Sequence, residues 1–330
     1  MAVITALKQS DLDALLSRYD LGTLSRYWPA SNGIENTNYF IRLNTPRGER
    51  DYVATILEQT VCSGRLLVPL LDLCDTTGLP VAPTLRNAQG KPTDEICGKP
   101  VLISPRLPGR HVFNPTSGQC AAIGRFLARF HIAGSALNES AEDHPRNAQW
   151  LREMSALADH YIPFSDHQLM EDAICSIASM LERQDVEKLP QGIIHGDLFR
   201  DNALFTERGL SGVLDFHHAA RGYWIYDIAV AANDWCNDTG GVMDPDRTMA
   251  LIRAYHAIRP LSREEVWFFP VFTLYAALAF WLSRLTVALR ARDASNIPFN
   301  NPDEFQHIVA QHASHFFYLD YRLLENGGSV

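Results

Sequence analysis

The sequence predicts an α+β fold in which a small N-terminal part contains an antiparallel sheet and a larger C-terminal part is mainly helical. Short β-rich runs with one intervening helical pattern fill the first hundred residues, turn-forming residues gather at 104–110, and helical periodicity dominates afterwards. We therefore expect two lobes, at 1–104 and 105–330, with a hinge at about 104–110.

An amphipathic helix is expected near the N-terminus. Ser10 with Asp13 predicts a capped start, and Gly22 predicts its end. One apolar face of this helix carries Leu12, Leu15, Leu16 and Tyr19.

A hairpin is expected next, because two β-rich runs at 38–43 and 51–57 flank the turn composition of 45–48. A second helix is expected to begin at Ser63 and to end at Gly78. Further strands are expected in three places: on either side of 87–90, and at 100–104.

Helical patterns make up most of the C-terminal part. They lie at 118–134 and at roughly 145–160, 166–184, 226–236, 246–257 and 263–292, and a β-like stretch at 192–215 interrupts them. Ser262 with Glu265 predicts a capping box for the last long helix. The apolar run at 266–282 contains Pro270 and is shorter than the roughly 20 residues of a bilayer span, so we interpret it as a buried helix.

Composition excludes several broad classes. The net charge of −9 and the pI of about 5.7 argue against a nucleic-acid-binding surface, which needs clustered Lys and Arg. The six cysteines are scattered, without a zinc or disulfide pattern, and the N-terminus lacks the pattern of a signal peptide. We expect a cytoplasmic protein with no membrane or nucleic-acid partner.

The densest cluster of functional residue types lies in the β-like stretch. His-Gly-Asp at 195–197 is followed by Asn202, and a second apolar run ends in Asp215. Transfer of a phosphoryl group needs a carboxylate that orients the acceptor hydroxyl and accepts its proton, and oxygen ligands that hold Mg²⁺. We therefore predict Asp197 as the catalytic base and Asn202 with Asp215 as the metal ligands.

A purely structural interpretation of the same residues has Asp197 and Asn202 in turns and Asp215 at a strand end. The His-Gly-Asp lead-in, the spacing and the second apolar strand together favour the catalytic interpretation.

These motifs resemble the catalytic loop of aminoglycoside phosphotransferases and choline kinases, which share a protein-kinase-like fold. Asp-Phe at 215–216 is similar to the metal-binding Asp-Phe-Gly segment, with His217 in place of the glycine. Asp227 looks like the acidic residue of this superfamily that braces the catalytic loop, which is a structural role.

Further segments resemble the bacterial homoserine kinases of this superfamily. They are Gly-Ile-Glu-Asn-Thr-Asn-Tyr-Phe at 33–40, Tyr-Val-Ala-Thr-Ile-Leu-Glu at 52–58 and Trp-Leu-Ser-Arg at 281–284. The resemblance covers about residues 10–325. It implies ATP and Mg²⁺ as cofactors and phosphorylation of the side-chain hydroxyl of L-homoserine to O-phospho-L-homoserine, a step toward threonine.

The nucleotide-binding residues follow from the same resemblance. Gly33, Asn36 and Asn38 lie where the phosphate-covering hairpin belongs, although a plain β-turn also explains them. Thr55 replaces the usual phosphate-binding Lys, which leaves Arg42, Arg65 or backbone N–H groups of 31–38 to meet the phosphates. The adenine is expected against the hinge, near Ser104 and Arg106.

The acceptor-binding residues are less constrained. Arg284 is a candidate for the homoserine carboxylate, with a buried ion pair between helices as the equal alternative. Arg200 is expected to neutralise the transferring phosphoryl group. His217 is placed near the acceptor, although a supporting role is the simpler interpretation for His217, His218 and Asp234.

Two other functions stay open at this point. One is a kinase for another amino alcohol, such as an aminoglycoside, choline or hydroxylysine. The other is a catalytically weak nucleotide-binding module, since the phosphate-binding Lys is absent. Neither the oligomeric state (monomer or homodimer) nor feedback regulation nor a preference for ATP over GTP follows from the residues.

Overall fold

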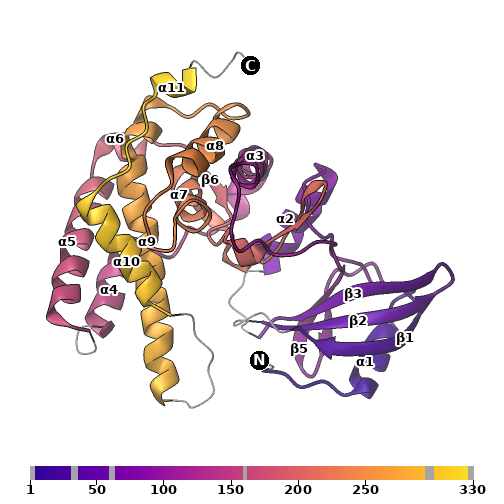
Figure 1. Ribbon diagram of the computed structural model, residues 1–330. Helices are drawn as coiled ribbons and strands as arrows, with labels where there is room; N and C mark the ends of the chain where they lie inside the picture. Colours follow the sequence, from indigo (N-terminus) through magenta and orange to yellow (C-terminus); the bar gives the residue numbers. More distant parts are fainter. Residues whose placement is uncertain (1–3, 31–35, 59–63, 159–161, 294–300, 326–330) are drawn as a thin grey trace. The chain divides into compact units, whose positions relative to one another are not determined.

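The computed structural model describes residues 4–30, 36–58, 64–158, 162–293 and 301–325. The chain divides into two compact units, Met1–Gly109 with Gly212–His217 and Arg110–Ser211 with His218–Val330. The predicted α+β fold is confirmed, because the first unit holds an antiparallel sheet and the second is mainly helical (Figure 1). The boundary predicted at 104–110, and the roles of nucleotide-binding and catalytic lobe, stay predictions.

The sheet of the first unit has the strand order β1-β2-β3-β5-β4, with every neighbouring pair antiparallel. Its strands are β1 (Thr23–Pro29), β2 (Thr37–Thr45), β3 (Gly48–Ile56), β4 (Asp94–Ile96) and β5 (Lys99–Pro105). β2 and β3 form the predicted hairpin, in register from Thr37↔Ile56 to Thr45↔Gly48.

Two details of this sheet differ from the prediction. The sequence pattern does not reveal β1, because this edge strand pairs only with β2 and its exposed residues show no clean alternation. The strand expected before Asn87 is wrong: in that stretch only Val81 makes a bridge, to Val213, and Pro83 has no N–H to donate to a ladder.

The core of the first unit lies between the sheet and α1 (Gln9–Leu16). Alternation along β2 places Tyr39, Ile41 and Leu43 on the buried face. The buried side of α1 consists of Leu12, Leu15 and Leu16, but the helix ends at Leu16, so the predicted extension through Tyr19 to Gly22 is wrong. The predicted Ser10 cap is wrong, because the helix begins at Gln9 and Asp11 Oδ2 accepts a hydrogen bond from the backbone N–H of Lys8 (2.8 Å). α2 (Gly64–Thr76) also belongs to this unit, whereas Ser63 lies outside the described residues.

The second unit contains the helices α3 (Ser117–Gly134), α4 (Ala148–Ala158), α5 (Phe164–Leu181), α6 (Gln184–Glu187), α7 (Trp224–Trp235), α8 (Pro245–His256), α9 (Arg263–Asp293), α10 (Asp303–Ser314) and α11 (Arg322–Glu325). β6 (Gln191–Ile194) pairs with β9 (Ala220–Tyr223), and β7 (Ala203–Thr206) forms a hairpin with β8 (Gly209–Val213). The predicted capping box of α9 is confirmed, because Ser262 N–H donates to Glu265 Oε2 (2.8 Å) and Glu265 N–H donates to Ser262 Oγ (3.1 Å).

α3 and α8 pack unusually closely, and a glycine allows this. A Cβ on Gly124 of α3 would lie 2.1 Å from the carbonyl oxygen of Leu251 on α8, well inside contact distance. The helix predicted at 118–134 therefore uses Gly124 as its contact point, which the apolar periodicity of Ile123, Phe126 and Leu127 does not reveal.

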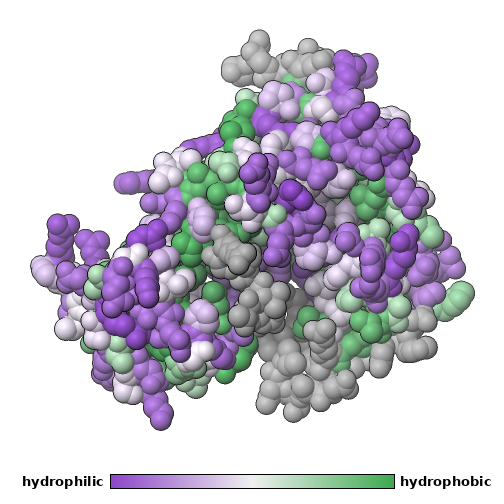
Figure 2. Space-filling model, turned by 180° about the vertical axis from the view of Figure 1, so that it is seen from behind, coloured by the Kyte–Doolittle hydropathy of each residue, from purple (hydrophilic) through white to green (hydrophobic). Residues whose placement is uncertain are grey.

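α9 is long and apolar enough to cross a membrane by length and composition, but 83% of its apolar window is buried. It packs against α4, α5, α7 and α10, which surround it in Figure 1. On the face of the molecule in Figure 2, hydrophobic residues form separate groups between hydrophilic ones instead of one continuous band. The prediction of a buried helix at 266–282 agrees with this packing.

A buried histidine joins three of these helices. His312 of α10 is 2% exposed and donates through Nε2 to Asn233 Oδ1 of α7 (2.8 Å), while Asn233 Nδ2 donates to the carbonyl oxygen of Thr273 on α9 (2.8 Å). Burial lowers the pKa of His312 to about 4, because the charged imidazolium is poorly solvated there.

This histidine should make the protein less stable in mild acid. The unfolded chain takes up a proton at His312 below about pH 6.5, whereas the folded chain does so only near pH 4, so the free energy of unfolding falls as pH drops through that window. Between pH 7 and pH 5 the contribution of His312 to this fall is about 2 kcal/mol. His312→Gln keeps a donor for Asn233 but cannot take up a proton. We expect its free energy of unfolding, measured by urea denaturation, to fall by about 2 kcal/mol less than that of the wild type between pH 7 and pH 5.

His315→Gln is the matched control, because His315 follows the same helix but is exposed. Equal pH dependence of the wild type and His312→Gln would contradict the assignment of a buried neutral imidazole.

Candidate active site

The loop that carries the predicted catalytic residues connects β6 to β7 and is held by the buried carboxylate of Asp227. Asp227 lies in the first turn of α7 and is fully buried. Its Oδ2 accepts the backbone N–H of His195 (2.8 Å), and its Oδ1 accepts the backbone N–H of Gly196 (2.8 Å). The bracing role predicted for Asp227 agrees with these contacts.

A neutral histidine completes the environment of Asp227. His131 of α3 lies with Nε2 2.9 Å from Asp227 Oδ2 and Nδ1 2.8 Å from the hydroxyl of Tyr255, and it stacks on Trp224. Burial lowers the pKa of His131, so Nε2–H donates to the carboxylate and Nδ1 accepts from Tyr255. Burial alone would raise the pKa of Asp227, but the hydrogen bonds donated by His131 and by the backbone N–H of His195 outweigh it and lower the pKa.

The glycine of the His-Gly-Asp motif has a conformational reason. Gly196 has φ +75°, and a Cβ there would lie 3.1 Å from the carbonyl oxygen of His218. Both the left-handed backbone and the close approach favour glycine at this position. Without them the backbone N–H of residue 196 could not point at Asp227.

Asp197 and Asn202 are in direct contact. Asn202 Nδ2 donates to Asp197 Oδ2 (3.0 Å) and to the backbone carbonyl oxygen of Asp197 (2.8 Å). Because both donated bonds use the amide nitrogen, the amide oxygen of Asn202 faces away from Asp197 and has the chemistry of a metal ligand. The two residues predicted as base and ligand are therefore brought together, although their roles stay predictions.

Asp215 belongs to the first unit and has an unusual backbone. Its φ of +61° lies in the left-handed region, which costs a non-glycine residue about 1–3 kcal/mol, and residues strained in this way cluster at functional sites. Its side chain is 41% exposed, and His217 Nε2 lies 4.0 Å from its Oδ1. Strain at a half-exposed carboxylate supports the prediction that Asp215 is a metal ligand.

The predicted donor set suits Mg²⁺ and not a transition metal. Among the described residues no group of three His, Cys, Asp or Glu side chains could hold a metal ion. Mg²⁺ commonly takes only one or two protein oxygens and completes its shell with water and phosphate oxygens. The amide oxygen of Asn202 and the carboxylate of Asp215 are ligands of that kind.

Arg200 is tied to the second unit more firmly than predicted. Its backbone N–H and Nε donate to Asp234 Oδ2 (2.6 and 3.1 Å), and its Nη2 donates to Asp234 Oδ1 (3.1 Å). Burial opposes the charge of Arg200, but the Asp234 carboxylate outweighs this and raises the pKa of Arg200. These bonds support a role in holding the loop on α7, and the predicted contact with the phosphoryl group stays a prediction.

The predicted nucleotide residues of the first unit gather on one face of its sheet. Asn38 and Thr55 are register partners on the face opposite the α1 core, and Thr55 Oγ1 donates to Asn38 Oδ1 (2.7 Å). Asn36 Oδ1 accepts the backbone N–H of Glu58 (3.2 Å), whereas Gly33 lies outside the described residues. Arg42 shares the face, but its Nε and Nη2 donate to Asp51 (2.7 and 3.0 Å).

The hinge residues have partners in the same sheet. Ser104 pairs with Val53 in the β3–β5 ladder. The Arg106 guanidinium lies 4.2 Å from the ring centre of Phe40 and 3.3 Å from Asp51 Oδ2. Their predicted contacts with adenine are not tested by this geometry.

Arg284 is engaged within the second unit. Its Nη1 lies 2.6 Å from Glu304 Oε2 and 3.2 Å from the carbonyl oxygen of Asn301, and its guanidinium stacks on Phe305 at 4.4 Å. This geometry favours the alternative stated for Arg284, an ion pair that joins α9 to α10. Its predicted role in binding a carboxylate stays a prediction.

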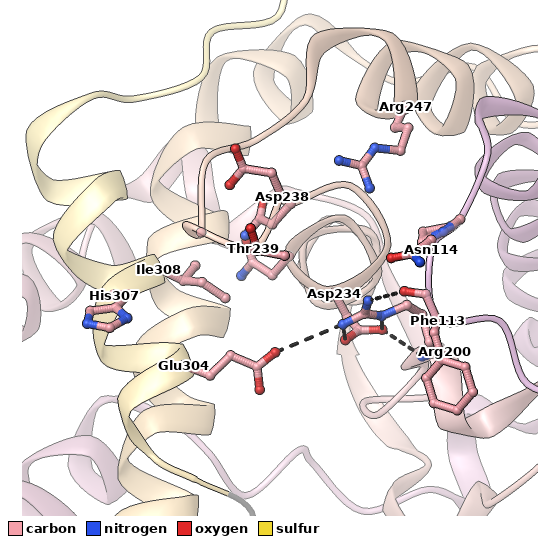
Figure 3. Close-up of a pocket in the computed structure, with 14 residues that line it drawn as sticks. Phe113, Asn114, Arg200, Asp234, Asp238, Thr239, Arg247, Glu304, His307 and Ile308 are labelled. Atoms are coloured by element: carbon pink, nitrogen blue, oxygen red, sulfur yellow. Dashed lines mark hydrogen bonds and ion pairs between the residues drawn. The ribbon is translucent and has the colours of Figure 1, made fainter.

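A cavity of about 460 Å³ lies in the second unit beside the catalytic loop (Figure 3). It is lined by Phe113, Asn114, Pro115, Arg200, Asn233, Asp234, Asn237, Asp238, Thr239, Gly241, Arg247, Glu304, His307 and Ile308. Apart from Arg200, and Asp234 with its predicted supporting role, this lining was not predicted as a site. One signal was available: Asp234 follows Asp227 by seven residues, so both lie on the same face of α7.

The Asp227 brace leads to a test that needs no substrate. In Asp227→Asn one acceptor becomes an NH₂ group that faces a backbone N–H, so we expect a loss of about 2–3 kcal/mol in unfolding free energy. Faster amide hydrogen exchange at His195 and Gly196 should accompany it. Tyr255→Phe, which removes the hydroxyl that donates to His131 and leaves the Asp227 carboxylate in place, is the control and should cost about 1 kcal/mol without faster exchange in the loop. Unchanged exchange in Asp227→Asn would contradict the brace.

Comparison with known proteins gives the same family at the level of sequence and fold. The family model described as "Phosphotransferase enzyme family" matches residues 27–261. A homoserine kinase of Pseudomonas aeruginosa (strain LESB58) is 36% identical over 328 residues, which are 98% of this chain and 100% of that one. A homoserine kinase of Methylobacillus flagellatus is 37% identical over 289 residues, or 86% of this chain and 87% of that one.

Solved structures share the fold at much lower identity. An amicoumacin kinase in complex with AMP-PNP and Ca²⁺ superimposes with a TM-score of 0.71 at 15% identity, covering 97% of both chains. A spectinomycin phosphotransferase has a TM-score of 0.70 at 12% identity and covers 94% of this chain and 98% of that one. With a family model that matches most of its length and relatives above 30% identity that it covers almost completely, the chain belongs to the phosphotransferase enzyme family.

Proposed function

We propose that the chain transfers the γ-phosphate of ATP to the side-chain hydroxyl of L-homoserine, giving O-phospho-L-homoserine and ADP in the cytoplasm. The substrate is supported by relatives named homoserine kinase at 36–37% identity along nearly the whole chain. The reaction type is supported above all by one observation, the contact between Asp197 and Asn202 in a loop anchored on Asp227.

The chemistry of the proposal follows from these side chains. The homoserine hydroxyl donates to the Asp197 carboxylate, which accepts its proton while the oxygen forms a bond to the γ-phosphorus and the bond from that phosphorus to the β–γ bridging oxygen breaks. Asn202 orients Asp197 through Nδ2. Mg²⁺, when held by Asn202 and Asp215, supplies positive charge for the phosphate oxygens.

The phosphate contact without a lysine is part of this proposal. Thr55 donates its hydroxyl proton to Asn38 Oδ1, which directs the Nδ2 protons of Asn38 elsewhere on the same sheet face. We place Asn38, with Asn36 and Gly33, at the nucleotide phosphates and Ser104 and Arg106 near the adenine. A neutral amide as phosphate donor fits a site whose charge is supplied mainly by the metal.

Substrate choice is the first test. We expect ADP release to be stimulated strongly by L-homoserine, and by less than a hundredth of that rate with choline, ethanolamine or kanamycin at equal concentration, because a site that binds the α-carboxylate rejects analogues that lack it. Hydroxylysine keeps the α-ammonium and α-carboxylate, so its rate tests the length of the side chain instead. A coupled ADP assay measures this. Preference for choline or an aminoglycoside would replace homoserine as the substrate while leaving the reaction type intact.

The base is tested separately. Asp197→Ala should lower kcat for L-homoserine by about 10²–10⁴-fold, because no group then accepts the hydroxyl proton. Equilibrium binding of Mg–ATP should stay close to that of the wild type, which calorimetry can check. Asp201→Ala, a change four residues further along the same loop, is the matched control for loop disturbance. Wild-type turnover in Asp197→Ala would exclude Asp197 as the base.

A further inference from the structure

The cavity beside the catalytic loop has a fixed wall. Arg200 follows Asp197 by three residues, and its backbone and guanidinium are both bound to Asp234 of α7 (Figure 3). Arg200 Nη1 also donates to the carbonyl oxygen of Phe113 (2.7 Å), which lines the cavity beside it. A molecule bound in this cavity therefore lies against residues that are continuous with the loop of the proposed base.

One side chain in the lining indicates that the cavity binds a ligand. Asn237 is 8% exposed, and neither its Oδ1 nor its Nδ2 has a hydrogen-bond partner among the described residues. A buried amide without partners costs about 1–3 kcal/mol for each unsatisfied group, and such groups in native structures are usually satisfied by a ligand or ordered water. The amide needs one acceptor for Nδ2–H and one donor for Oδ1.

The charges around the cavity are nearly balanced. Asp234 is paired with Arg200, and Glu304 is paired with Arg284 and lies 3.9 Å from Arg200. Asp238, the third carboxylate of the lining, accepts the backbone N–H groups of Gly240 and Val242 through Oδ1 (both 2.9 Å). A polycation would need several carboxylates without such partners. A molecule that carries one positive and one negative group fits this lining better.

Arg247 is the positively charged side chain that can bind the negative group of such a molecule. Its Nε lies 3.5 Å from Asp244 Oδ2, its side chain is 16% exposed, and Figure 3 shows its guanidinium turned toward the cavity. A guanidinium presents a planar pair of donors that matches a carboxylate. Asn237 lines the same cavity, and its Nδ2 is available to donate a further hydrogen bond to that carboxylate.

We propose that this cavity binds the α-amino and α-carboxylate groups of the acceptor amino acid, with Arg247 and Asn237 as its specificity-determining residues. Arg247 and Asn237 Nδ2 hold the carboxylate, and Asn237 Oδ1 with Glu304 holds the ammonium. The cavity exceeds what a four-carbon amino acid fills, so water is expected beside the substrate. The assignment rests on the proposed function and places the carboxylate at Arg247 instead of Arg284.

The experiment compares L-homoserine with 3-amino-1-propanol, which keeps the hydroxyl and the ammonium but lacks the carboxylate. In Arg247→Gln we expect kcat/KM for L-homoserine to fall about 10–100-fold, mainly through KM, because a charge-assisted bond is lost. The kcat/KM for 3-amino-1-propanol and the KM for ATP should stay within about twofold of the wild type. Arg247→Lys keeps the positive charge but loses the planar pair of donors, so its kcat/KM for L-homoserine should lie between those of the wild type and Arg247→Gln.

Asn237→Ala gives an independent arm, with an expected rise in KM for L-homoserine of about tenfold. Arg253→Gln is the matched control, because Arg253 lies on the same helix and is exposed. Calorimetric titration of L-homoserine into Asp197→Asn, with and without Arg247→Gln, reads binding without turnover. Thermal melting of each variant identifies any that does not fold. If Arg247→Gln does not fold, the kinetic comparison with the wild type is made with Arg247→Lys and Asn237→Ala.

The outcomes separate the two proposals. If the wild type phosphorylates L-homoserine but Arg247→Gln changes both substrates equally or neither, the assignment of this cavity is overturned and the proposed function stands. If the wild type does not phosphorylate L-homoserine, the proposed function fails and this assignment fails with it.

Discussion

The site depends on one buried carboxylate. Asp227 has no exposure to solvent, yet it stays ionised because two backbone N–H groups and the neutral His131 donate to it. An ionised carboxylate in that position imposes the backbone direction of His195 and Gly196, and thereby the position of Asp197. The rigid element at the centre of the site is therefore a hydrogen-bonded loop on α7 and not a strand.

The helix α7 also binds the second half of the catalytic loop, two turns after Asp227. Asp234 binds both the backbone and the guanidinium of Arg200, and Trp235 Nε1 donates to the carbonyl oxygen of Leu198 (3.0 Å). One face of α7 thus holds both halves of the loop. This arrangement explains why an arginine inside a catalytic loop contributes more to its shape, in the geometry described, than to the charge near the phosphate.

Spacing and residue type predicted the parts of the fold and site that are local in sequence. The hairpin of β2 and β3, the capping box at Ser262 and the selection of Asp197 and Asn202, which the structure shows in contact, are of this kind. α10 was missed although Phe305, Ile308, Val309 and His312 follow the helical period, so that signal was present in the residues. β1 offered no such signal, because an exposed edge strand lacks alternation. Arg247 and Asn237 could not be selected because only tertiary packing places them beside Arg200.

The burial of α9 has a consequence for how the chain is made. During synthesis α4, α5 and α7 leave the ribosome before α9 and can cover it at once, but α10 is translated after it. Until α10 docks, one side of a long apolar helix is uncovered, and such surfaces promote aggregation of nascent chains. The hydrogen bonds from His312 to Asn233 and from Asn233 to Thr273 then hold α10 on α7 and α9 and keep that side of α9 covered. Truncations that remove α10 are therefore expected to harm the yield of soluble protein before they affect chemistry.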